Sequence, residues 1–329
     1  MKNSSYALDI IMPHYKEPWD TVKKFFSMLE LQRGIDFHSF RVLIVNDGEE
    51  NAFPLNQFSS FPYEVLQISI THAGVSAARN AGLLASEAEW VMFCDCDDMF
   101  AHPYALLDIL HVLPAKEADL LWTDIWTEAN RNGIFIMKKE FNAVFVHGKL
   151  FRREFLLKND IYFDEHIGYC EDSLFVTTAL MLCNEKRQGR IRTQMPAYVW
   201  CDTDGSVTNT SRTKDIAPMC MMYRDKKVCE LYREKRNHDE YCAMIARTVI
   251  DAYHYLNRTV PLSEELEQMQ ADFYAWYMEH KAEYESVPYE TLKKIKESSR
   301  KSAFINAGLL DESVSVTKWL KSLDVKGDI

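Results

Sequence analysis

Three carboxylates follow directly after an apolar run in the segment "WVMFCDCDDMF", residues 90–100. Asp95, Asp97 and Asp98 lie so close in the chain that their ionised forms repel one another, and each is costly to remove from water. If the run is a strand that continues through Asp97, the side chains of Asp95 and Asp97 share one face. A hard divalent cation, Mg²⁺ or Mn²⁺, would relieve the repulsion and would complete its shell with water and substrate phosphates. The segment therefore predicts a metal and a phosphorylated ligand.

Other acidic residues have both a structural and a catalytic interpretation. Asp98 precedes a helix predicted to begin near residues 102–103, so it is either a functional carboxylate or a residue of a solvated turn or helix cap. Glu171 and Asp172 open a second predicted helix in "YCEDSLF", where acidic side chains favour the positive end of the helix dipole. Beside a metal and a diphosphate, a carboxylate there would instead accept the proton of an attacking hydroxyl. The residues alone leave both interpretations open.

A helix start rich in small residues gives a third candidate, in "THAGVSAARNAGL", residues 71–83. Gly74 and the small side chains after it let a ligand approach the amino end of the helix closely. Arg79 would add a planar fork for a diphosphate or a carboxylate. The same small residues also let a helix pack tightly on a sheet, and Arg79 has a structural alternative in a pair with an aspartate.

The elements that position these residues are short apolar runs that alternate with segments of helical period from residue 8 to about residue 128. Continuous apolar runs in such an alternation predict an α/β fold with a buried, mostly parallel, doubly wound sheet. Ligands of such sheets bind beyond the carboxyl ends of the strands. His14, Asp47 and the Asp95 segment each follow a run, so we expect them at one crevice.

The hydrophobic pattern of the sequence changes near residue 215. Residues 1–214 carry the alternating pattern, whereas residues 215–329 consist of segments with helical period separated by "NRTVP" and "SVP". We therefore predict an α/β domain over residues 1–214 followed by an α-helical region over residues 215–329.

Composition excludes several classes of protein. The 329 residues are 47% hydrophobic and 26% charged, with a formal net charge of −11, which argues against a nucleic-acid partner. No run is long enough to span a bilayer, and the first residues lack a signal-peptide core. Eight scattered cysteines without a CxxC pair are typical of reduced thiols. We expect a cytoplasmic protein and leave open a peripheral contact with the inner membrane face.

The order of the motifs resembles the family 2 glycosyltransferases, nucleotide-sugar enzymes of the GT-A fold. The matching segments span residues 8 to about 212 and are "IIMPHYKEP", "VNDGEE", "GVSAARNAGL", "WVMFCDCDDMF", "GKLFRREFLLKNDIYFDEHIGYCEDSLF" and "YVWCDTDGSVTNTSR". Each motif is loose by itself, but together and in this order they are specific. The resemblance implies metal-dependent transfer of a sugar from a nucleoside diphosphate sugar, most often a UDP-sugar, to an acceptor hydroxyl, with inversion by single displacement.

The resemblance also implies a donor site with Mn²⁺ or Mg²⁺ as cofactor. The residues near the base and ribose would be Pro13, His14, Tyr15, Glu17 and Asp47. Arg79 would lie near the ribose or diphosphate. Asp95-Cys96-Asp97 would be the DxD signature, with Asp97 as the chief metal ligand and Asp95 shared between ribose and metal. Metal-dependent members of the family often take a further ligand, commonly histidine, from the segment after the last core strand. Here that segment, "VWCDTDGSVTNT", has no histidine, so Asp202, Asp204 or water would complete the metal shell.

The resemblance implies that residues 1–214 are the catalytic domain, and the helical residues 215–329 would bind the acceptor or form a homo-oligomer. On the acceptor side, it implies that Asp172 is the catalytic base and that Glu171 orients the acceptor or the base. His147 and Lys149 fall near the segment that forms the acceptor side of the site in the family, so His147 would contact the acceptor or the donor sugar; a surface or hydrogen-bonded structural histidine is the alternative. The acceptor would be a glycan, a polymer or another hydroxyl compound. Ser206 and Arg212 belong to a polar loop that we predict to close over the diphosphate.

Two other functions use a related fold. A nucleotidyltransferase also has paired carboxylates, but it usually opens with a glycine-rich loop, and "MPHYKEPWD" has no glycine. A nucleotide-binding scaffold would have no reason to keep mutually repelling carboxylates, and it would not hydrolyse a donor sugar. Both remain the alternatives to a transferase.

Overall fold

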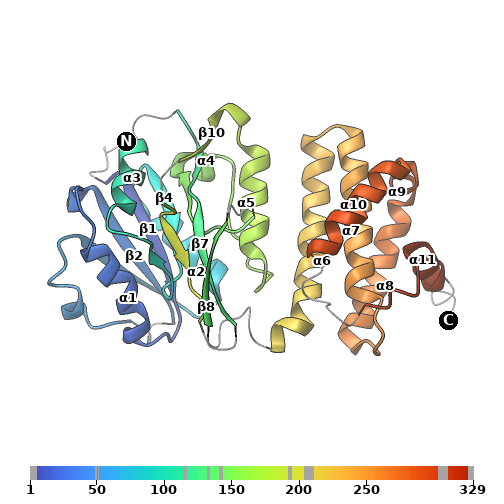
Figure 1. Cartoon of the computed structure of the whole chain (residues 1–329), viewed down its shortest axis with the longest axis horizontal. Helices are drawn as coiled ribbons and strands as arrows, with labels where there is room; N and C mark the ends of the chain where they lie inside the picture. Colours follow the sequence, from blue (N-terminus) through green and yellow to red (C-terminus); the bar gives the residue numbers. More distant parts are fainter. Residues whose placement is uncertain are drawn as a thin grey trace. The chain divides into compact units, whose positions relative to one another are not determined.

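The computed structural model of the chain describes residues 6–48, 50, 52–113, 117–131, 134–140, 144–191, 195–203, 211–302 and 310–324. The chain divides into two compact units, residues 1–206 and 207–329, which run from blue to yellow-green and from yellow to red in Figure 1. The boundary predicted after residue 214 falls inside α6 (Ser211–Lys235), a helix of the second unit. The acceptor-binding or oligomerisation role of the second unit stays a prediction.

Strands and helices alternate through most of the first unit. The helices are α1 (Trp19–Glu30), α2 (Val75–Ala85), α3 (Ala105–Val112), α4 (Arg153–Lys158) and α5 (Glu171–Leu182), with short 3-10 helices at Phe37–Ser39, Leu55–Gln57 and Glu185–Arg187. The strands are β1 (Leu8–His14), β2 (Phe40–Asp47), β3 (Glu64–Ile70), β4 (Trp90–Phe93), β5 (Met99–Phe100), β6 (Leu120–Trp122), β7 (Ile125–Arg131), β8 (Ile134–Glu140), β9 (Lys149–Arg152), β10 (Gln188–Arg190) and β11 (Tyr198–Trp200).

The main sheet has the strand order β10-β6-β9-β4-β1-β2-β3. β1 pairs in parallel with β2 and β4, and β2 pairs in parallel with β3, while β9 runs antiparallel between β4 and β6. A smaller sheet has the order β5-β11-β7-β8. His14 lies opposite Asn46 in the register of β1 and β2, so the two strands end together. The predicted α/β fold with a mostly parallel sheet is confirmed.

The continuous apolar runs fill two cores, one on each face of the main sheet. Ile10 and Met12 of β1 belong to a core that α1 and α3 complete, whereas Ile11 belongs to a second core that α2, α4 and α5 complete. Because side chains alternate along a strand, a strand covered by helices on both faces shows no apolar-polar alternation. Burial on both faces fixes the strand ends, and with them the residues of the crevice.

The second unit is helical, as predicted. Its helices are α6, α7 (His238–Leu256), α8 (Glu264–Glu279), α9 (Lys281–Ser286), α10 (Tyr289–Ser302) and α11 (Val316–Asp324) (Figure 1). α7 contacts each of the other five, and its core contains Tyr253, Phe273 and Trp319. Among the residues that the structure describes, no helix is both long enough and apolar enough to cross a membrane.

Candidate functional site

A turn from Asp95 to Asp98 follows the buried strand β4. The strand ends at Phe93, and the backbone N–H of Asp98 donates to the carbonyl oxygen of Asp95 at 3.2 Å. The expectation that Asp95 and Asp97 share the face of a continuing strand is therefore wrong, because aspartates favour a turn over an extended strand at this point. The turn instead brings Asp98 beside Asp95.

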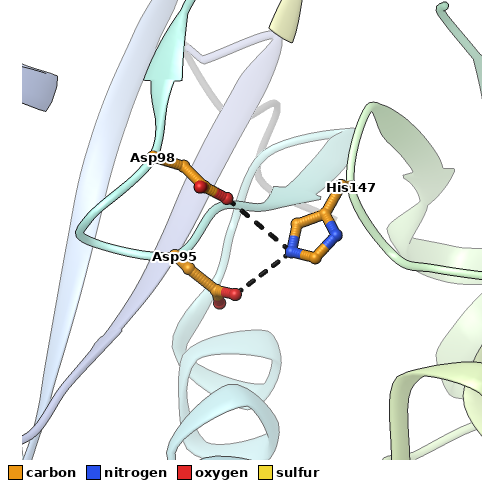
Figure 2. Close-up of side chains that lie close together, drawn as sticks. All are labelled: Asp95, Asp98 and His147. Carbon is orange, nitrogen blue, oxygen red and sulfur yellow. Dashed lines mark hydrogen bonds and ion pairs between the residues drawn. The ribbon is translucent and has the colours of Figure 1, made fainter. Parts of the chain in front are cut away.

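His147 completes a compact cluster with these two aspartates. Its Nε2 lies 3.1 Å from Asp95 Oδ2 and 3.7 Å from Asp98 Oδ2, and Figure 2 shows this one ring nitrogen facing both carboxylates. The three side chains offer ligand atoms that all lie within 4.8 Å of one another. Nδ1 of the same ring is buried and has no hydrogen-bond partner within the described ranges. We call Asp95, Asp98 and His147 the cation cluster.

Tyr198 of β11 holds the cation cluster in place from the smaller sheet. Its hydroxyl donates to Asp98 Oδ2 at 2.7 Å and accepts from the backbone N–H of Asp95 at 3.2 Å. Its ring stacks on His147 with centroids 5.9 Å apart. Asp98 Oδ1 accepts from the backbone N–H of Cys201, so Asp98 joins the two sheets. The helix-cap interpretation of Asp98 is wrong, since α3 begins at Ala105 after Tyr104.

Burial and charge determine protonation within the cation cluster. Burial, opposed by the charge of His147 and supported by that of Asp95, raises the pKa of Asp98 to about 8. Burial alone would also raise the pKa of Asp95, but the charges of Arg79 and His147 hold it well below its usual range. Burial disfavours the charged imidazole, yet Asp95 outweighs it and raises the pKa of His147 to about 9. A bound cation would replace protons that the cluster otherwise holds.

Arg79 links the cation cluster to α5. Its Nη2 donates to Asp95 Oδ1 at 2.8 Å, and its Nη1 donates to Glu171 Oε1 at 2.6 Å. The guanidinium is almost fully buried and lies over the ring of Phe163. The structural alternative for Arg79, a pair with an aspartate, is thus present in the structure. A contact between Arg79 and a ribose or diphosphate stays a prediction.

Asp172 is held by backbone groups of two segments. Its Oδ1 accepts from the N–H of Ser173 at 2.7 Å, and its Oδ2 lies 3.4 Å from the N–H of Val146. The neighbouring Glu171 is buried, which raises its pKa, and the charge of Asp172 adds to the rise. The first turn of α5 therefore presents two carboxylates that are anchored in different ways, one by Arg79 and one by peptide N–H groups.

The turn before β9 contributes one residue to the cation cluster and another that contacts Asp172. His147 belongs to the cation cluster, while Val146 contacts Asp172. Gly148 has a φ of +68°, and a Cβ there would lie 2.6 Å from Ile125 Cγ2. Lys149 donates through Nζ to the carbonyl oxygen of Phe145, and burial lowers its pKa to about 8. This tight turn, held by the hydrogen bond of Lys149, thus fixes the separation between the cation cluster and Asp172.

The residues predicted near the nucleoside base differ in exposure. The ring of His14 is buried, with Nδ1 2.9 Å from Asn46 Oδ1 and Nε2 2.9 Å from the carbonyl oxygen of Glu17. Glu17 accepts from the backbone N–H of Tyr15 at 2.7 Å. Pro13 and Cys96 are buried. Tyr15 and Glu17 are therefore the more accessible members of this group, and its contacts with a base stay predictions.

Asp47 organises the loop that leads into α2. It accepts from the backbone N–H groups of Ala73 and Gly74 at 2.7 and 2.9 Å, and its Oδ2 lies 2.8 Å from His72 Nδ1. The half-exposed His72 ring stacks on Tyr15 at a centroid distance of 4.3 Å. His72 was missed by the sequence analysis, although it lies inside the quoted glycine-containing motif and histidine is a common site residue.

Some predicted residues lie apart from these contacts. Asp97 is outside the cation cluster; burial raises its pKa, the charge of Asp95 adds to the rise, and Asp97 forms a hydrogen bond with Thr203. Ser206 lies outside the described residues, as does Asp204. Arg212 belongs to α6, but its side chain is also outside the described part. The assignment of Asp97 as chief metal ligand stays a prediction.

Comparison with known proteins identifies the family of the chain. Residues 9–179 match the profile of glycosyl transferase family 2. The chain is 23% identical over 229 residues to GgaB of Bacillus subtilis, a minor teichoic acid biosynthesis protein, covering 64% of this chain and 25% of GgaB. It is 28% identical over 132 residues to poly(ribitol-phosphate) beta-N-acetylglucosaminyltransferase TarS of Staphylococcus aureus, covering 37% of this chain and 23% of TarS. The chain thus spans about a quarter of each of these curated relatives.

A solved structure shows the same fold. The crystal structure of S. aureus TarS 1–349 in complex with UDP-GlcNAc has a TM-score of 0.54 at 16% identity, covering 90% of this chain and 92% of that one. The family profile covers just over half of the chain and includes the turn after β4, Arg79, the turn before β9 and the first turns of α5. With its GT-A-like first unit, the chain belongs to glycosyl transferase family 2.

Proposed function

We propose that the chain transfers a sugar from a UDP-sugar to an acceptor hydroxyl, with metal dependence and inversion at the anomeric carbon. The observation that carries the proposal is the pair of hydrogen bonds donated by Arg79. One goes to Asp95 in the cation cluster, and the other goes to Glu171, the neighbour of Asp172. Through this buried arginine, the proposed diphosphate end and the proposed base end are fixed in one hydrogen-bonded chain. A single displacement requires such fixed spacing, because the leaving group and the base act on opposite sides of the reacting carbon.

The cation cluster fits a divalent metal in its donor set. Asp95 and Asp98 offer the carboxylate oxygens that Mg²⁺ and Mn²⁺ prefer, and His147 offers an imidazole nitrogen in place of the histidine that the later segment lacks. Asp97, on the same turn, remains the further candidate. When bound, the cation would neutralise negative charge on the departing diphosphate.

Asp172 is suited to the role of general base. Two peptide N–H groups orient its carboxylate, so it holds one position without being neutralised by an arginine, in contrast to Glu171. It would take the proton from the acceptor hydroxyl as that oxygen attacks the sugar. Glu171, held by Arg79, would orient the acceptor or the base.

The relatives support a narrower choice of donor and acceptor. The structure of TarS with UDP-GlcNAc favours a UDP-N-acetylhexosamine as donor. The name of TarS, a poly(ribitol-phosphate) beta-N-acetylglucosaminyltransferase, favours a hydroxyl of a polyol phosphate polymer as acceptor. We propose both for this chain.

A product analysis with one variant tests the proposal. UDP-GlcNAc carries an α-linked sugar, so NMR of the product formed on a ribitol phosphate oligomer should show a β-linkage. Asp172→Asn should bind UDP normally and lose turnover by about a thousandfold, since proton transfer contributes on the order of 10²–10⁴. Glu154→Gln, an exposed carboxylate of α4, is the matched control. An α-linked product would refute inversion, and equal turnover of the two variants would remove Asp172 as the base.

A further inference from the structure

The second unit contains a polar cavity whose lining includes none of the residues of the cation cluster or of the Asp172 segment. Its volume is about 510 Å³, which lies within the range of small-molecule sites. The residues that line it come from the turn between α6 and α7 and from the corner between α8 and α9. All of them are polar or ionisable, so the cavity is suited to a hydrophilic ligand.

The turn between α6 and α7 contributes positive charge to the cavity. Arg233 lies in the last turn of α6 and Arg236 directly after the helix, and both side chains are exposed. Neither forms an ion pair with a carboxylate in the described part of the chain. His238 is the first residue of α7, so the positive end of this helix dipole adds to the field. Two guanidinium forks beside a helix start match the oxygens of a phosphate.

The corner between α8 and α9 contributes hydrogen-bond acceptors. Glu279 and Glu283 line the same cavity, and Glu283 Oε2 is buried with no hydrogen-bond partner among the described residues. Nδ1 of His280 donates to the carbonyl oxygen of Trp276 at 2.8 Å, so the ring is held in place with Nε2 as its other polar atom. The two carboxylates match hydroxyl groups rather than a second phosphate.

The two halves of the lining require one ligand with two kinds of group. A simple anion would meet the arginines but would be repelled by Glu279 and Glu283. A neutral polyol would meet the carboxylates but would leave both guanidinium groups without a counter-charge. A polyol phosphate satisfies both halves, because its phosphate and its hydroxyls are joined by a short chain.

We propose that this cavity binds a polyol phosphate unit of the acceptor polymer, with the phosphate on Arg233 and Arg236 and the hydroxyls on Glu279, Glu283 and His280. The inference rests on the proposed function, because it concerns the acceptor of the same reaction. Binding one unit of a polymer on the transferase itself raises the effective concentration of the remaining acceptor hydroxyls.

Calorimetric titration of the full chain with ribitol 5-phosphate tests the inference. Arg233→Gln combined with Arg236→Gln should weaken binding about tenfold, because charge-assisted hydrogen bonds to the phosphate are lost. Lys293→Gln combined with Lys294→Gln is the matched control, since both lysines are exposed on α10 and the charge change is the same. The control should bind like the unsubstituted chain. Equal binding by both double variants, or no binding by the unsubstituted chain, would overturn the inference.

Further ligands separate the contributions of the two halves. Glu283→Gln should reduce the preference for ribitol 5-phosphate over inorganic phosphate, because repulsion of a plain anion falls while a hydroxyl acceptor is weakened. An unchanged preference would contradict the role of the carboxylates. Soluble poly(ribitol phosphate) and phosphatidylglycerol vesicles present the same chemistry from a polymer and from a lipid surface. Binding to vesicles alone would overturn the assignment to the acceptor.

UDP titration of the same proteins keeps this inference distinct from the proposed function. The arginine double variant should bind UDP as the unsubstituted chain does. If ribitol 5-phosphate binds as expected but UDP does not bind at all, the proposed function fails while the cavity stands. If UDP binds but ribitol 5-phosphate does not, only the cavity assignment fails.

Discussion

Gly148 allows a quantitative test of the turn that spaces the cation cluster from Asp172. An alanine there would adopt a φ of +68°, which costs about 1–2 kcal/mol for a residue with a Cβ. Its Cβ would also lie 2.6 Å from Ile125 Cγ2 and 3.0 Å from Thr123 Oγ1. Overpacking of this kind costs about 1–3 kcal/mol. Gly148→Ala should therefore lower the free energy of unfolding by about 2–5 kcal/mol.

Three other glycines separate the two causes. Gly74 has a φ of +96°, but an added Cβ would have no neighbouring atom within 4 Å, so its alanine variant should lose about 1–3 kcal/mol from strain alone. Gly82 has no positive φ, but its Cβ would lie 2.4 Å from Ile11 Cγ2, so crowding alone destabilises its variant. Gly168 has neither problem, and its variant should change stability by less than about 1 kcal/mol.

Urea unfolding of the four variants, followed by tryptophan fluorescence, measures these losses, and turnover shows their effect on the site. Gly148→Ala should show the largest loss of stability and turnover taken together, because any shift of the turn moves both His147 and the N–H of Val146 that contacts Asp172. If Gly148→Ala is as stable and as active as Gly168→Ala, the turn does not position the site and the reasoning is refuted.

Three more substitutions have defined outcomes. Burial raises the pKa of Asp225 to about 6 in the folded state, so the stability that this carboxyl contributes is complete below about pH 4 and is lost as the pH rises to about 6; Asp225→Asn should remove this pH dependence of stability in urea titrations. Lys149→Met removes the bond to Phe145 and should lower turnover about tenfold without weakening UDP binding, measured by steady-state kinetics and titration. Tyr198→Phe removes a hydrogen bond to Asp98 and should weaken Mn²⁺ binding about 10–100-fold in a metal titration.

Each of these outcomes has a clear opposite. An unchanged pH slope in the Asp225 variant would mean that this carboxyl is not the group that titrates. Equal loss of UDP binding and turnover in the Lys149 variant would indicate general misfolding of the turn rather than loss of positioning. Unchanged Mn²⁺ affinity in the Tyr198 variant would separate Asp98 from the metal.

The strands were predictable from the sequence because burial on both faces leaves continuous apolar runs. The runs that contain Ile10, Leu43 and Val91 have no competing period, and the polar residues after them mark the strand ends. The antiparallel strand β9 pairs with β4 and β6, and such pairing depends on contacts between segments far apart in the chain. A short apolar run gives no signal for the direction of its neighbours.

The candidate site was predictable in its residue types but not in its grouping. Asp95 was identified from local repulsion, but its partnership with Asp98 depends on a turn that replaces the expected strand. His147 was considered only for sugar contacts, because nothing in its spacing from Asp95 indicates that β9 lies next to β4. Arg79 was placed near a ligand, whereas its pair with Glu171 depends on how α2 and α5 pack on the sheet.

The measurement that tests the central claim most directly is thermal unfolding of the chain with UDP in the presence of Mn²⁺ or of EDTA. UDP at about a hundred times its dissociation constant should stabilise the folded state by about 2.7 kcal/mol with Mn²⁺. The shift should be lost in EDTA and in Asp95→Asn, and it should persist in Glu154→Gln. An equal shift in EDTA would contradict the metal site, and no shift under any condition would contradict a UDP-sugar transferase.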